Sequence, residues 1–156
     1  MLTKKKVLVT FAAGFLLFLA AAPAGARGIS TSESSLLAAI NGTRAAHGLA
    51  GVRFDVRLVR AARSHSADML RRNYFAHGAF SARMRASGAR GPTFGEDLAW
   101  GTAATPQWII GRWLASPSHR AILLRPGFRR VGIGIVTGTF SGYGGATVVT
   151  ADFAGT

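Results

Sequence analysis

The segment from Phe75 to Gly101, "FAHGAFSARMRASGARGPTFGEDLAWG", contains three side chains that could do chemistry in a stretch otherwise rich in glycine, alanine and arginine. They are His77 and the adjacent acidic pair Glu96 and Asp97. Imidazole nitrogens and carboxylate oxygens are ligands of divalent cations such as Zn²⁺. A carboxylate can also simply hydrogen-bond an imidazole, which fixes its tautomer and raises its pKa. The residue types allow either arrangement, provided that folding brings them together.

Covalent catalysis is not favoured by the sequence. The chain has no cysteine, so a thiolate nucleophile is excluded, and no Gly-x-Ser-x-Gly elbow is present. Several serines lie near histidines along the chain, but adjacency in sequence does not make a catalytic triad. These serines are Ser64, Ser66, Ser116 and Ser118.

The N-terminus has the pattern of an export signal. Three lysines precede an apolar run from Val7 to Ala22, and the small residues Ala24-Gly25-Ala26 follow. We therefore expect residues 1–26 to be a cleaved signal peptide. A retained membrane anchor is the competing interpretation, because the run is close to the lower limit of about 17 residues for a membrane span.

The charge balance is strongly basic. The net charge is +13, and without residues 1–26 the chain keeps 16 arginines against six acidic residues. The arginines are scattered and form no long run, so they do not predict specific nucleic-acid binding, and a genomic bias toward arginine explains part of the excess. The remaining charge favours anionic polymers or lipid headgroups of the cell envelope.

Capping residues and apolar spacing predict two long helices. Ser30 and Glu33 form a capping-box pair for a helix that ends near Gly48. Asp55 can cap a second helix whose apolar face includes His65. A histidine on such a face is more often a hydrogen-bonded core residue than a ligand, so we expect His65 to be buried.

The middle of the chain predicts shorter elements. Residues 81–87 form a short helix ended by Gly88, and "TFGEDLAWG" is an extended segment or an edge strand. Two Ser/Thr-Pro pairs each supply an N-cap and a first-turn proline for two helices that abut almost without a linker; the pairs are Thr105-Pro106 and Ser116-Pro117. The spacing of the tryptophans is more typical of core residues than of a groove lining; they are Trp100, Trp108 and Trp113.

The C-terminal part changes from helical to strand periodicity. "RRVGIGIVTG" and "ATVVTADF" alternate around the turn "SGYGG", which predicts an antiparallel hairpin. The glycines of "GIG" do not form a nucleotide-binding loop, because no helix follows them. Helices followed by a hairpin indicate an α+β fold with helices packed on an antiparallel sheet.

Five segments in order resemble the bacterial branch of the CAP superfamily, which is named for cysteine-rich secretory proteins, antigen 5 and pathogenesis-related proteins. They are "FDVRLVRAARSHSADMLRRNYFAH", "GEDLAWG", "WLASPSHRAILL", "RRVGIGI" and "VTADF". The resemblance covers roughly residues 35–154. It implies an α-β-α sandwich, a secreted or envelope location, and a cleft lined by two histidines and two acidic residues. We expect a short lead-in at 27–34 and the CAP domain at 35–156.

The resemblance assigns cleft positions one by one. His77 matches the first histidine, Glu96 matches the glutamate of a Gly-Glu-Asn-Leu segment, and His119 matches the second histidine. Asp97 replaces the usual asparagine, and the second glutamate has no acidic counterpart, since Ser116 stands there. The resemblance supports His77 and His119 as ligands of Zn²⁺ or another divalent cation, with Glu96 as a third ligand or as the base that orients water.

Three functions stay open at this point. The preferred one is an exported CAP-domain protein that binds a lipid, a cell-wall fragment or a partner protein in its cleft or along its basic surface. The second is a metal-dependent hydrolase that acts on envelope peptides or glycans with Glu96 as base. The third is a sporulation, adhesion or virulence factor with a vestigial groove. Nothing in the sequence requires catalysis, and the oligomeric state is not readable from it.

Overall fold

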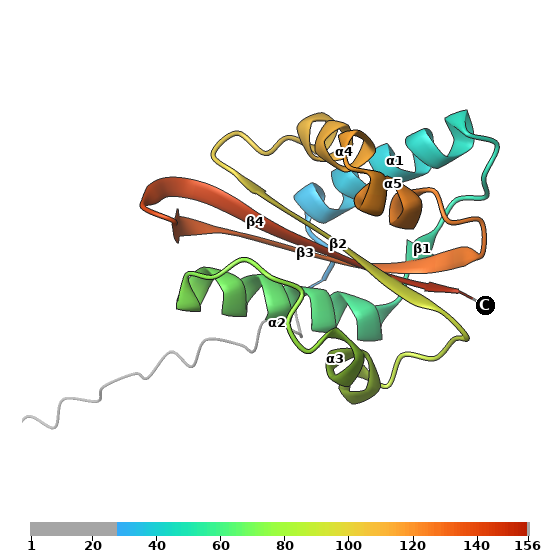
Figure 1. The fold of residues 1–156 in the computed structure, drawn as a ribbon, viewed down its shortest axis with the longest axis horizontal. Helices are drawn as coiled ribbons and strands as arrows, with labels where there is room; N and C mark the ends of the chain where they lie inside the picture. Colours follow the sequence, from blue (N-terminus) through green and yellow to red (C-terminus); the bar gives the residue numbers. More distant parts are fainter. Residues whose placement is uncertain (1–27, 156) are drawn as a thin grey trace, which may run out of the picture.

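Two layers of helices enclose a four-stranded sheet (Figure 1) in the computed structural model, which describes residues 28–155. One layer contains α1 (Thr31–Ala46), α4 (Pro106–Ala115) and α5 (Pro117–Leu123). The other contains α2 (Val56–Arg72) and α3 (Phe80–Ser87). The α+β class and the α-β-α sandwich are therefore confirmed. The expected signal peptide and its alternative, a membrane anchor, lie outside the described residues; within 28–155 no helix has the length and hydropathy of a membrane span.

The sheet has the order β1-β3-β4-β2. The predicted hairpin is confirmed as β3 (Phe128–Phe140) and β4 (Tyr143–Gly155), which are longer than the alternating segments suggest. β2 (Phe94–Gly101) pairs antiparallel with β4 and forms one edge, as expected for an edge strand. The two-residue β1 (Arg53–Phe54) pairs in parallel with β3, which makes the sheet mixed; so short a strand has no periodicity that the sequence could reveal.

The predicted helix caps are confirmed with one exception. Ser30 and Glu33 form both hydrogen bonds of the capping box, and Asp55 and Thr105 accept hydrogen bonds from the backbone at the starts of α2 and α4. Ser116 precedes α5, but its hydroxyl makes no capping bond. It lies instead 3.2 Å from the hydroxyl of Ser118.

α2 packs directly on the backbone of β3 because two strand residues there have no side chain. A Cβ atom at Gly132 would overlap with the backbone of Leu58, and one at Gly134 would overlap with that of Ala62. The hydroxyl of Ser66 on α2 lies 2.9 Å from the carbonyl oxygen of Gly134, so the contact is also hydrogen-bonded. The alternating glycines of "GIG" thus serve close helix–sheet packing.

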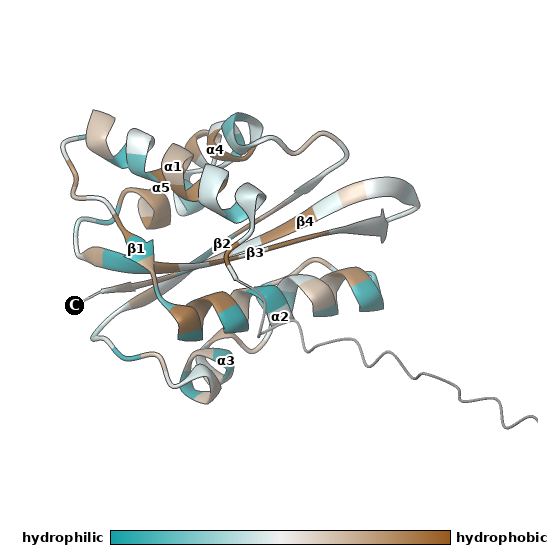
Figure 2. Cartoon of the chain, turned by 180° about the vertical axis from the view of Figure 1, so that it is seen from behind, coloured by the Kyte–Doolittle hydropathy of each residue, from teal (hydrophilic) through white to brown (hydrophobic). Residues whose placement is uncertain are grey.

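The opposite face of the sheet carries the largest apolar cluster. It is formed by the inward faces of α1, α4 and α5 with the central strands, whose hydrophobic stretches are visible in Figure 2. Within this layer Arg44 is fully buried, and its guanidinium donates to backbone carbonyls of Ala50, Leu123, Arg125 and Phe128. Burial lowers the pKa of Arg44. Because every one of these bonds leaves α1, Arg44 fixes that helix to the loop that follows it and to the segment from the end of α5 to the start of β3.

The close α2–β3 contact predicts a large effect of one methyl group. We expect Gly134→Ala to lower the free energy of unfolding by at least about 2 kcal/mol, because the helix must move away from the strand. Urea unfolding followed by circular dichroism measures this change.

Gly111 provides the matched control. It lies in α4, and a Cβ there would meet nothing within 4 Å. Gly111→Ala should therefore stabilise the protein by about 0.5–1 kcal/mol. Equal unfolding free energies for the two variants would contradict the packing argument.

Candidate functional site

The carboxylate of Glu96 is the centre of a polar cluster on the α2–α3 side of β2. Its side chain is buried, and one oxygen accepts a hydrogen bond from Nδ1 of His77 at 2.8 Å. The other oxygen pairs with the guanidinium of Arg83 on α3 and lies 3.9 Å from Nε2 of His65 on α2. Three elements and one loop therefore meet at a single buried carboxylate.

The loop between α2 and α3 places His77 at this carboxylate. α2 ends at Asn73 in the left-handed conformation, with φ of 51°, which turns the chain toward β2. Arg83 then donates to the carbonyl oxygen of His77 at 3.1 Å as well as to Glu96. One guanidinium thus holds both the loop and the carboxylate.

The contact with Glu96 determines the tautomer of His77. A carboxylate only accepts hydrogen bonds, so Nδ1 of His77 carries the proton and donates it. In the uncharged tautomer that this contact selects, the lone pair lies on Nε2. Because 54% of the His77 side chain is exposed, this nitrogen is available to a ligand.

His65 is buried and hydrogen-bonded, which confirms the expectation of a core histidine. Its Nε2 lies 3.0 Å from the carbonyl oxygen of Ala76. Burial lowers the pKa of His65, and the charge of Arg83 lowers it further, while Glu96 opposes the shift. The neutral His65 ring therefore holds the loop that carries His77 through its hydrogen bond to Ala76.

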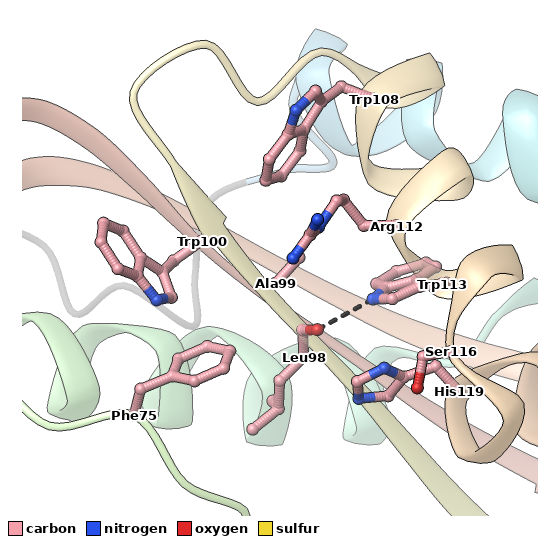
Figure 3. A pocket seen from close by; sticks show the side chains of 9 residues that line it. All are labelled: Phe75, Leu98, Ala99, Trp100, Trp108, Arg112, Trp113, Ser116 and His119. Carbon is pink, nitrogen blue, oxygen red and sulfur yellow. Dashed lines mark hydrogen bonds between the residues drawn. The ribbon is translucent and has the colours of Figure 1, made fainter.

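His119 lies on α5, in the other helical layer, and the structure shows no hydrogen bond between it and Glu96. It lines a pocket of about 320 Å³ that runs along β2 and is also lined by Ser116 and Trp113 (Figure 3). Burial lowers the pKa of His119, and His77 lowers it further, so the two imidazoles influence each other across the edge of the sheet. The neutral form of His119 is favoured.

The three residues suggested by the resemblance are thus placed in two groups. His77 and Glu96 are in contact, and His119 faces an adjacent pocket. In the part of the chain that the structure describes, no three His, Asp or Glu side chains converge in a way that could hold a metal ion. Glu96 is already bonded to Arg83 and His77, so the described residues do not fit a three-ligand centre.

Two members of the cluster have no signal in the sequence. Arg83 is one of 16 arginines, and Asp152 lies directly opposite Glu96 in the β2–β4 pairing. The Asp152 carboxyl is fully buried and finds no donor among the described residues. Burial, and then the charge of Glu96, raise the pKa of Asp152 well above its usual range. A protonated Asp152 can donate to Glu96, and only knowledge of the strand register would have predicted this pair.

Asp97 is a second isolated carboxyl, on the opposite face of the sheet. Both of its oxygens are buried without a hydrogen-bond partner among residues 28–155. Burial, and then Glu96, raise the pKa of Asp97 to about 8. The group is therefore mostly protonated at neutral pH.

The fold and the cluster define a class of protein in which helices on both faces of a sheet frame a His/Glu cleft at its edge. The model of the Cysteine-rich secretory protein family, CAP, matches residues 37–153. This match covers most of the chain, which therefore belongs to that family, and the resemblance noted from the five segments is confirmed.

Related proteins agree with this assignment. The chain is 33% identical to the uncharacterized protein YkwD of Bacillus subtilis over 113 residues, which is 69% of this chain and 44% of that protein. It is 32% identical to the uncharacterized membrane protein YlbC of the same organism, covering 68% of this chain and 32% of YlbC. The chain thus spans less than half the length of either relative.

Two solved structures share the fold. One is an extracellular protein containing a SCP domain from Bacillus anthracis, with a TM-score of 0.69, 24% identity, and coverage of 79% of this chain and 40% of that one. The other is an outer surface protein from Borrelia burgdorferi, with a TM-score of 0.70, 17% identity, and coverage of 83% and 97%. At these identities the likeness concerns the fold alone.

The buried carboxyl of Asp97 predicts a pH dependence of stability. Between about pH 4 and pH 8 the unfolded chain loses this proton while the folded chain keeps it, so stability falls as pH rises through that window. One such group contributes a slope of up to about −1.4 kcal/mol per pH unit. Asp97→Asn removes the titration and should make the slope less negative, as measured by urea unfolding at several pH values.

Asp68→Asn is the matched control, because the hydrogen bond from Tyr74 lowers the pKa of Asp68, which therefore stays ionised across this window. It should leave the slope between pH 5 and pH 8 nearly unchanged. If the slope of Asp97→Asn were as negative as that of the wild type, Asp97 would be shown to ionise in the folded protein at ordinary pH.

Proposed function

We propose that this CAP-domain protein is exported and binds a ligand in the cleft formed by His77, Glu96 and His119. The observation that carries the proposal is the bond between Glu96 and Nδ1 of His77. It fixes the position of an exposed imidazole, and the pocket that His119 lines runs along the same strand, β2. A buried carboxylate supported by Arg83 is a costly arrangement unless it positions something, and here it positions His77.

An envelope or extracellular location is supported from two sides. Residues 1–26 have the pattern of an export signal, and the two structural relatives are an extracellular and an outer surface protein. The excess of arginine over acidic residues favours an anionic ligand such as a wall fragment, a lipid headgroup or an acidic partner protein.

The geometry supports binding more directly than hydrolysis. Glu96 is enclosed by Arg83, His77 and His65, so its oxygens are not directed at open space where a water molecule could be activated. The imidazole of His119, whose neutral form is favoured, can accept a hydrogen bond from a ligand without any reaction. Binding is therefore the function that we infer.

A binding assay on exported-form protein, residues 27–156, tests the proposal. Purified cell-wall sacculi and phosphatidylglycerol vesicles are the two probes, and pelleting measures the affinity. The double variant His77→Ala/His119→Ala should weaken binding to the preferred probe at least about tenfold. Binding should also weaken as ionic strength rises, because charge contributes to it.

His47→Ala controls for the loss of a histidine. His47 is exposed at the end of α1, and it belongs to neither α5 nor the loop that carries His77. If the double variant binds both probes like His47→Ala does, the cleft is not the binding site. Stoichiometric zinc in the dialysed wild-type protein, lost in His77→Ala, would favour the metal-dependent hydrolase instead.

A further inference from the structure

The pocket beside His119 is walled by aromatic rings that are only partly buried. Trp108 is 39% exposed and Phe75 is 41% exposed, while Trp100 is half-buried. Figure 3 shows Trp100 and Phe75 on one side of the pocket, with Trp108 and Arg112 of α4 on the other. Of the three tryptophans expected in the core, only Trp113 is fully buried there, so that expectation is wrong for Trp108.

The position of the Trp108 ring depends on the strand that it faces. Its ring packs against the end of β2 at Gly101, where a Cβ atom would lie only 2.9 Å from Cη2 of the ring. The missing side chain leaves room for the indole at the pocket wall, where Trp108 keeps part of its surface exposed. An exposed ring held in one position loses little conformational freedom when a ligand stacks on it.

Arg112 supplies a charge at the same wall. Its guanidinium lies over the Trp108 ring, 5.8 Å from the centroid, and it forms no ion pair within residues 28–155. No acidic side chain lines the pocket, whose other titratable group is His119. A pre-positioned guanidinium with no carboxylate nearby is complementary to an anionic group on a ligand.

The walls discriminate between kinds of anionic ligand. A peptide that added as a strand to β2 would need the outward carbonyl of Leu98, but the indole N–H of Trp113 already donates to it at 2.9 Å. An acyl chain would need a deep aliphatic cavity, whereas the aliphatic lining residues Leu98 and Ala99 are buried within the sheet. Flat aromatic faces instead suit the C–H face of a sugar ring, because the π face is electron-rich.

We propose that this pocket binds a saccharide that carries a carboxylate, with a sugar ring on the Trp108 face and the carboxylate on Arg112. The proposal rests on the proposed binding function, and it names the ligand class that the cleft takes. A volume of about 320 Å³ lies at the small end of the range for ligand sites, so one or two sugar units fill it. Longer glycans would continue past Phe75 along the groove.

Two disaccharides test the proposal, one of which carries a lactyl ether with a carboxylate that the other lacks. The probes are N-acetylglucosaminyl-N-acetylmuramic acid and di-N-acetylglucosamine, and quenching of tryptophan fluorescence reports stacking on the exposed indoles. The acidic disaccharide should bind about tenfold more tightly than the neutral one. Arg112→Gln should remove this difference, and Trp108→Leu should weaken both complexes about tenfold.

Arg120→Gln is the matched control, because it removes the same charge from the exposed surface of α5 without touching this pocket. It should retain the preference for the acidic disaccharide. Equal affinities of the wild-type protein for the two disaccharides, or equal effects of Arg112→Gln and Arg120→Gln, would overturn the proposal. So would phosphatidylglycerol binding that needs Trp108 and Arg112 when neither disaccharide binds.

The same experiment separates this inference from the function on which it rests. If sacculus or vesicle binding still depends on His77 and His119 while the disaccharides do not bind, the cleft is a binding site but not for an acidic saccharide. If neither polymer nor disaccharide binding depends on any of these residues, both proposals fail. Circular dichroism spectra that match the wild type exclude misfolding as the cause of a loss.

Discussion

The direct contact between α2 and the backbone of β3 sets the positions of most of the residues that matter here. Gly132 and Gly134 remove the side chains that would otherwise hold the helix away, and Ser66 then reaches across to the strand. At this distance His65, the residue before Ser66 on α2, lies within reach of Glu96 on the next strand but one. The loop that leaves α2 brings His77 to the same carboxylate. A helix displaced by one side-chain layer would break both contacts together, so the packing and the site depend on the same two glycines.

A buried carboxylate is stable only when its partners are supplied from several elements. Glu96 has Arg83 from α3, His77 from the loop and His65 from α2, and its cross-strand neighbour Asp152 can lend a proton. The cost of burying the Glu96 charge is offset by a guanidinium that also holds the His77 backbone. Asp152 has no cation of its own, and burial beside Glu96 favours its neutral form. The five polar groups therefore act as one unit, in which the protonation of Asp152 supports the charge of Glu96.

Local patterns allowed much of the fold to be predicted, whereas the site depended on pairings between distant segments. Capping at Ser30, Asp55 and Thr105 is a short-range property, and so is the alternation of the hairpin strands. The opposition of Glu96 and Asp152 depends on the register of strands that are 56 positions apart in the chain, and no local rule fixes it. The exposure of Trp108 likewise depends on Gly101 beside it, because helical spacing alone indicates a core position. Family resemblance supplied His77, Glu96 and His119, but not the separation of His119 from the other two.

The edge position of β2 explains why the two groups can belong to one cleft. An edge strand has helices on both faces and no strand along one side, so side chains from the α2–α3 layer and from the α4–α5 layer can approach each other only around that side. An open edge also invites pairing with other strands, and native proteins protect such edges. Here Trp113 covers the carbonyl of Leu98, while His77 and His119 flank the strand from opposite faces. The side chains that cover this edge form a groove, and each helical layer contributes one imidazole beside it.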